Sequence, residues 1–226
     1  TGVGKTRALI ADACYIACDK LFNKQRNQWE QNGTKEPTLF IATEQDLEEV
    51  QTMMIAFISE VDEEHIIDGE YLPGEWERVV EAAAVLKDSP LYVVQLPDFS
   101  LQDIENTIKY NIRQNGVKYV FFDYIHSSMK ILSEVTSKTG IKGLREDNVL
   151  FMISIRLKDL CNQYGIFIMS ATQLNADYVD SETPDQNLLR GAKSIADKID
   201  AGLIMLEATA KDLEALQPIL ENGGFV

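Results

Sequence analysis

The sequence is poor in the residues that build metal frameworks and disulfide networks. Its 226 residues include three cysteines and two histidines. So few ligands exclude a disulfide-rich secreted scaffold and indicate a reducing compartment. Cys14 and Cys18 lie four residues apart, but no second pair of ligands has a spacing typical of zinc. We therefore expect both thiols to be small buried side chains of one helix, and we predict no structural metal.

Long apolar runs and an excess of positive charge are also missing. No apolar run reaches the ~20 residues that span a bilayer, and no signal peptide is visible, so we expect no membrane association. The chain has 36 acidic and 21 basic residues, which gives a net charge of −15 at pH 7. This charge argues against a surface that attracts nucleic acid broadly, but it leaves room for a local basic strip.

The first residues carry the strongest functional motif. Gly4-Lys5-Thr6 matches the second half of the phosphate-binding pattern G-x-x-x-x-G-K-[ST], whose first glycine would precede Thr1. The glycine lets the backbone approach a polyphosphate, the lysine opposes the charge of the outer phosphates, and the threonine hydroxyl suits Mg²⁺. An amphipathic helical pattern begins directly at Lys5, as a phosphate loop requires. We assign nucleotide binding to Thr1, Gly2, Val3, Gly4, Lys5, Thr6 and Arg7.

Apolar runs alternate with helical patterns along the rest of the chain. Strands are expected at residues 38–43, 91–95, 117–122, 166–170 and 203–206. Helices are expected from Lys5, over 46–61, 73–87, 149–163 and 188–199, and from a capping box at Ser100 and Asp103 to near Gly116. The polar stretch 130–148 is expected to be a long loop. Buried strands separated by helices predict an α/β domain with a mostly parallel central sheet and helices on both faces.

Polar residues at the ends of these strands complete the candidate site, because ligands of parallel sheets collect at the carboxyl ends of the strands. Asp123 ends an apolar strand and suits the carboxylate on the metal side of a Mg²⁺-ATP site, together with Thr6. Glu44 suits a general base that polarises the water attacking the γ-phosphate, beside the catalytic Lys5. The alternative for Glu44 is a charge that stabilises the start of the next helix.

Five ordered segments resemble the C-terminal motor domain of DnaB-like replicative helicases, a group of RecA-like P-loop NTPases. They are Thr1–Thr6, Phe40–Glu44, Val120–Tyr124, Ser170–Asn175 and Leu189–Met205. The resemblance covers nearly the whole chain and implies one RecA-like ATPase domain over residues 1–226. It also implies that Gln173 senses the γ-phosphate. Arg7 and His126 depart from the residues usual in the family.

The resemblance also implies an activity and its partners. The expected cofactors are ATP and Mg²⁺, and the expected assembly is a homo-hexamer that moves 5′-to-3′ on single-stranded DNA, with primase and a helicase loader as further partners. The protein is expected in the bacterial cytoplasm, encoded by either a bacterium or a phage. Arg190 and Lys193 are candidates for contacts with DNA phosphates, although ordinary solvated charge at a helix start is the alternative. We expect the strand before the phosphate loop, an N-terminal collar domain and the arginine finger to lie outside these residues.

Two other functions fit parts of the pattern. One is a RecA-like recombinase or clock-type ATPase that forms filaments or rings without unwinding DNA. The other is an interaction module that binds ATP as a switch and hydrolyses little. Glu44 argues against the switch, and the segment Ser170–Asn175 favours the helicase over the recombinase.

Overall fold

The computed structural model describes residues 4–139, 146–173, 198–205 and 208–221. A central sheet has the strand order β4-β3-β5-β6, and each neighbouring pair is parallel. The strands are β3 (Thr38–Ala42), β4 (Leu91–Gln95), β5 (Tyr119–Asp123) and β6 (Phe167–Ser170). The predicted α/β class with a parallel sheet is therefore confirmed.

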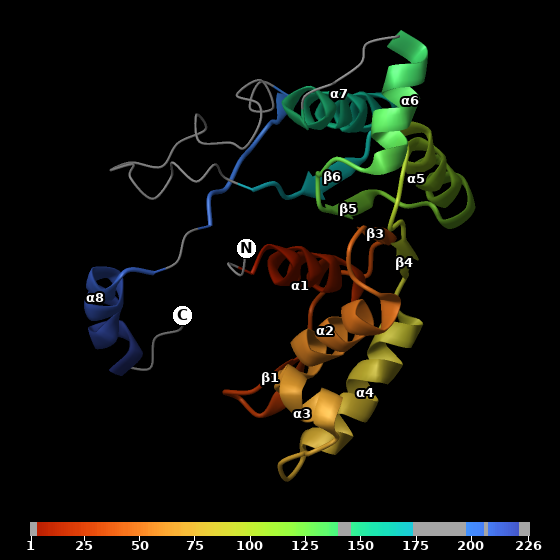
Figure 1. Cartoon of the computed structure of the whole chain (residues 1–226). Coiled ribbons are helices and arrows are strands. Elements are labelled where there is room, and N and C mark those ends of the chain that lie inside the picture. Colours follow the sequence, from red (N-terminus) through yellow and green to blue (C-terminus); the bar gives the residue numbers. More distant parts are fainter. Residues whose placement is uncertain (1–3, 140–145, 174–197, 206–207, 222–226) are drawn as a thin grey trace.

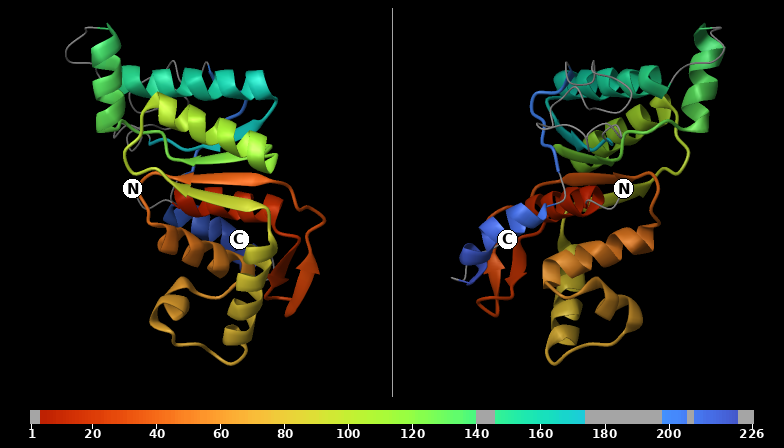
Figure 2. Two further views of the ribbon diagram at one scale, coloured as in Figure 1. Left: turned by 90° about the vertical axis from the view of Figure 1, so that its right-hand side faces the viewer. Right: turned by 60° about the vertical axis from the view of Figure 1, so that its left-hand side comes forward.

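Helices cover both faces of this sheet (Figure 1). One layer holds α1 (Lys5–Ala17), α2 (Leu47–Ser59), the short α3 (Glu63–Asp68) and α4 (Glu75–Asp88). The other layer holds α5 (Leu101–Asn115), α6 (Met129–Thr139) and α7 (Glu146–Tyr164). Figure 2 shows the sheet between the two layers, and Figure 1 shows α8 (Ala210–Glu221) apart from them at the left. None of the helices in the described ranges combines the length and the apolar composition of a membrane span.

The two layers give the domain two cores, one on each face of the sheet. Successive side chains of a strand point to opposite faces, so one strand contributes to both cores. In β3, Leu39 and Ile41 join the core under α5, α6 and α7, whereas Phe40 and Ala42 join the core under α1, α2 and α4. All five residues of β3 are buried. This double burial explains why the strand is apolar without alternation.

The prediction of a long loop over residues 130–148 is wrong. The structure has α6 from Met129 to Thr139, and α7 begins at Glu146. Ile131 and Val135 lie four residues apart on one face of α6 and are buried in the core. The loop was predicted because this stretch is rich in polar residues, but these residues lie on the outer side of an amphipathic helix.

The predicted elements nearest the C-terminus differ in another way. The predicted strand 203–206 is wrong for its described part, because residues 203–205 form no regular element and pair with no strand among the described residues. Leu203 is 86% exposed, so this apolar residue joins neither core. Most of the predicted helix 188–199 lies outside the described residues.

A hairpin between α1 and β3 is absent from the sequence-based prediction. Its strands are β1 (Lys20–Asn23) and β2 (Gln28–Gln31), and they pair antiparallel. The Asn23 side chain accepts hydrogen bonds from the backbone amides of Gln25 and Arg26, which closes the turn. Four-residue strands with charged and polar residues carry too weak an apolar pattern for detection.

The capping box of α5 gives a test of this fold. The amide of Asp103 donates to the Ser100 hydroxyl (3.0 Å), and the amide of Ser100 donates to the Asp103 carboxylate (2.9 Å). Ser100→Ala should lower the free energy of unfolding by about 1 kcal/mol, because one helix-start amide loses its partner. Urea unfolding measures the change. Ser137→Ala, at an exposed position of α6, is the control and should stay within about 0.5 kcal/mol of the wild type. Equal stability of the two variants would contradict the assigned cap.

Candidate active site

The strand register brings the predicted site residues to one end of the sheet. Ala42, the last residue of β3, lies beside Asp123, the last residue of β5. Phe122 lies beside Ser170, so the residues after β6 reach the same end. Glu44 and Gln173 follow their strands by two and three residues. Glu44, Asp123 and Gln173 therefore lie at the same sheet end.

The phosphate-loop helix starts at this end. Gly4 caps α1 with φ 85°, a left-handed conformation that strongly favours glycine. Lys5 and Thr6 are the first residues of the helix, where backbone amides lack helical partners and attract anions. Thr1, Gly2 and Val3 lie outside the described residues. The described part of the loop therefore has the conformation and helix start that a phosphate site needs.

Asp123 is the buried acid of the site, with 3% of its surface exposed. Its Oδ1 has no hydrogen-bond partner among the described residues. Burial raises the pKa of Asp123 and the nearby Glu44 carboxylate raises it further, while Thr6, Lys5 and His126 act in the opposite direction. A buried carboxylate oxygen without a partner, beside a threonine hydroxyl, is a donor set that suits Mg²⁺. Thr6 and Asp123 therefore fit the metal ion that the sequence predicts.

Glu44 is held by the residue that follows Asp123. The Tyr124 hydroxyl donates a hydrogen bond of 2.9 Å to Oε1 of Glu44. The Glu44 side chain is exposed, so water can reach it. An exposed carboxylate beside a buried acid and a phosphate loop can accept a proton from water.

Thr43 and His126 belong to the same cluster, and the sequence reasoning assigned neither to the site. The Thr43 hydroxyl donates to the carbonyl oxygen of Asp123 (2.7 Å) and accepts from the amide of Tyr124 (3.3 Å). Nδ1 of His126 lies 3.1 Å from the carbonyl oxygen of Tyr124. The sequence could have indicated Thr43, because this residue lies at a strand end directly before Glu44.

Other predicted residues are placed differently or not at all. Arg7 turns to α3, where its guanidinium pairs with Glu63 at 2.5 Å. The Arg7 side chain is 68% exposed. Gln173 is half-buried at the sheet end. Arg190 and Lys193 lie outside the described residues. Of the predicted site residues, Lys5, Thr6, Glu44 and Asp123 thus lie in one cluster, beside Thr43 and His126.

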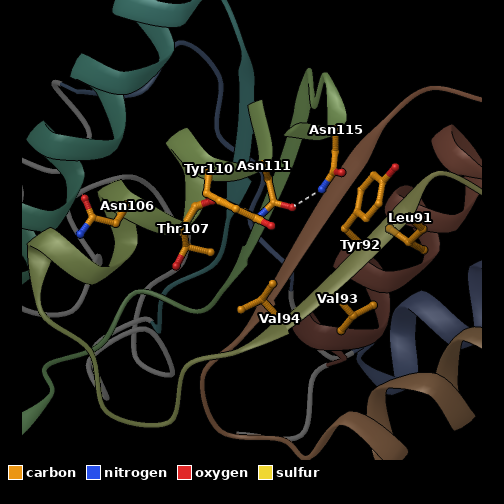
Figure 3. A pocket seen from close by; sticks show the side chains of 9 residues that line it. All are labelled: Leu91, Tyr92, Val93, Val94, Asn106, Thr107, Tyr110, Asn111 and Asn115. Atoms are coloured by element: carbon orange, nitrogen blue, oxygen red, sulfur yellow. Dashed lines mark hydrogen bonds between the residues drawn. The ribbon is translucent and has the colours of Figure 1, made fainter. Parts of the chain in front are cut away.

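A cavity of about 670 Å³ lies elsewhere, between the edge strand β4 and α5 (Figure 3). Its lining has no charged side chain and includes Asn111 and Asn115, which share a hydrogen bond of 2.8 Å. None of the described site residues lines this cavity. It also lacks the cations and carboxylates that a nucleotide and its metal ion need, so it is not the candidate active site.

Comparisons with known proteins now identify the family. The family model of the DnaB-like helicase C terminal domain matches residues 1–216. The chain belongs to the DnaB-like helicase family. It is 43% identical over 229 residues to the SPbeta prophage-derived uncharacterized protein YorI of Bacillus subtilis (strain 168), covering 100% of this chain and 45% of that protein. It is 22% identical over 165 residues to the replicative DNA helicase DnaB of Leifsonia xyli subsp. xyli (strain CTCB07), covering 73% and 31%.

Solved structures support the fold of this DnaB-like domain. A solved ATPase domain has a TM-score of 0.68 at 14% identity, and the match covers 88% of this chain and 64% of that one. A DnaB-like replicative helicase, solved to describe its interactions with primase, has a TM-score of 0.61 at 15% identity, with 73% and 39% covered. The chain spans less than half the length of the curated relatives it matches.

The buried charge of Asp123 leads to a prediction for stability. Asp123→Asn should raise the free energy of unfolding at neutral pH, because the amide avoids ionising a buried group. The folded-state pKa of Asp123 is raised, so the wild type gains stability as pH falls through that pKa, and its deficit to the variant should shrink. Denaturant unfolding between pH 4 and 8 measures both effects, with the exposed Asp159→Asn as control. A loss of stability that is independent of pH would contradict this account.

Proposed function

We propose that this DnaB-like domain is the ATP-hydrolysing motor of a replicative DNA helicase. The observation that carries the proposal is the convergence of Lys5, Thr6 and Glu44 around the buried Asp123 at one end of the sheet, where all three are close enough to shift the pKa of Asp123. Each group matches one requirement of phosphoryl transfer to water. Membership of the DnaB-like helicase family supports the same reaction.

The roles follow from charge and position. Lys5 and the amides at the start of α1 bind the outer phosphates of ATP. Thr6 and Asp123 would hold Mg²⁺, which supplies positive charge against the phosphates when it is bound. Glu44 accepts a proton from the attacking water. The oxygen atom of this water forms a bond to the γ-phosphorus while the bond between that phosphorus and the ADP oxygen breaks. Gln173 senses the γ-phosphate from the end of β6.

The proposal extends to partners of the longer protein. A motor of this family would act as a homo-hexamer on single-stranded DNA in the cytoplasm of a bacterial cell, with primase and a loader as further partners. Arg190 and Lys193 would contact DNA phosphates, since cationic side chains bind a strand without reading its bases. The net charge of −15 means that such contacts have to be local.

Two variants test the chemistry separately. Lys5→Ala should abolish binding of ATP, because it removes the charge that opposes the phosphates. Glu44→Gln should keep ATP affinity and lower turnover by about 10² to 10⁴, because an amide keeps the shape but cannot act as a base. Equilibrium binding and steady-state ATPase assays of the full-length protein give the two readouts.

Matched controls remove the same two charges at exposed positions away from the site. Glu48→Gln removes an exposed carboxylate from the first turn of α2, and Lys24→Ala removes an exposed cation of the hairpin. Both variants should bind and hydrolyse ATP as the wild type does. Equal loss of binding in Lys5→Ala and Glu44→Gln would show that Glu44 is structural and would contradict its role as base.

A third test concerns DNA. Arg190→Ala and Lys193→Ala should each weaken binding of single-stranded DNA and reduce the slope of log K against log salt by about 0.7 per lost phosphate contact. Fluorescence anisotropy with labelled oligonucleotides of different sequence, across a salt series, measures this slope, with Lys24→Ala as control. Unchanged affinity would remove both residues from the DNA site. A change confined to certain sequences would indicate base readout instead.

A further inference from the structure

Side-chain hydrogen bonds join the residues that follow β3 to those that follow β5, in addition to the backbone hydrogen bonds of the sheet. The backbone amide and the hydroxyl of Thr43 both donate to the carbonyl oxygen of Asp123, at 3.0 and 2.7 Å. The amide of Tyr124 donates to the Thr43 hydroxyl at 3.3 Å, and the Tyr124 hydroxyl donates to Glu44 at 2.9 Å. Residues 43–44 and 123–124 are therefore joined at the backbone and at their side chains.

The bond between Tyr124 and Glu44 matters because Glu44 is exposed. An exposed glutamate side chain samples several rotamers, and a base acts efficiently only while it points at the proton it removes. The charge-assisted hydrogen bond to Oε1 restricts this motion.

Tyr124 is itself fixed by its neighbours. Its ring lies 5.1 Å from the ring of His126, and its carbonyl oxygen lies 3.1 Å from Nδ1 of His126, a contact that requires the proton on Nδ1. The His126 ring packs edge-on against Phe99, with centroids 5.1 Å apart. Phe99 is fully buried in the core under α5. A continuous set of contacts thus leads from the core to the carboxylate of Glu44.

We propose that Tyr124 is a positioning residue that orients Glu44 for proton transfer from the attacking water. The inference rests on the proposed function, because it assigns Tyr124 a role toward the proposed base. Tyr124 follows the proposed metal-side acid directly in the chain. The hydrogen bond therefore also fixes the base relative to Asp123, so that both carboxylates keep one geometry.

Removal of one oxygen atom tests this role. Tyr124→Phe keeps the ring that packs against His126 and deletes the hydroxyl that reaches Glu44. We expect kcat for ATP of the full-length protein, with single-stranded DNA present, to fall about 10- to 100-fold, since a misplaced catalytic group costs rate in this range. KM for ATP and the affinity for a non-hydrolysable ATP analogue should stay unchanged. Tyr110→Phe, which deletes an exposed hydroxyl from α5, should leave kcat unchanged.

A double variant separates positioning from a general structural effect. In Glu44→Gln protein, Tyr124→Phe should cause no further loss in single-turnover rate, because there is no base left to orient. An equal fold-loss in both backgrounds, a raised KM with unchanged kcat, or a wild-type kcat for Tyr124→Phe would each overturn the role of Tyr124. Wild-type turnover by Glu44→Gln alone would instead overturn the proposed base, and with it the proposed function.

Discussion

The parallel pairing of β3 with β5 is the interaction on which the candidate site depends. Because Ala42 lies beside Asp123, the residues that follow these strands leave the sheet at the same height. A shift of one residue would turn Asp123 to the opposite face and separate it from Thr6. Both faces of β3 and β5 are buried under helices, so such a shift would also exchange the side chains of the two cores. The apolar residues that make the cores thus also set the geometry of the polar residues at the sheet end.

The site carries a cost that a purely structural cluster would avoid. Asp123 is almost fully buried, its pKa is raised by burial, and one of its oxygens has no hydrogen-bond partner among the described residues. Buried carboxylates are usually paired, and each exception calls for an explanation. Binding of a divalent cation together with a nucleotide is an explanation that fits Thr6 and Lys5 as neighbours. A buried carboxylate of this kind is typical of functional sites, where some stability of the fold is lost in exchange for activity.

Much of this arrangement could be predicted from the sequence, and the reasons are physical. β3 and β5 are doubly buried strands that read as apolar runs, and the capping box at Ser100 and Asp103 fixed the start of α5. Gly4-Lys5-Thr6 and two strand-end acids indicated the site, because parallel strands end together. α6 was missed because Ile131 and Val135 are two buried positions in a polar stretch. The link from Tyr124 to Glu44 joins residues 80 positions apart, so no local pattern encodes it.

The proposed motor converts ATP hydrolysis into movement along DNA. Strand displacement by the full-length protein tests it most directly, with a labelled duplex that carries a single-stranded tail. We expect displacement that requires both ATP and Mg²⁺ and that is lost in the Glu44→Gln protein. The opposite result is ATP hydrolysis without displacement of any duplex, whether its tail is 5′ or 3′. This result would contradict the proposed motor and favour an ATPase that does not unwind DNA.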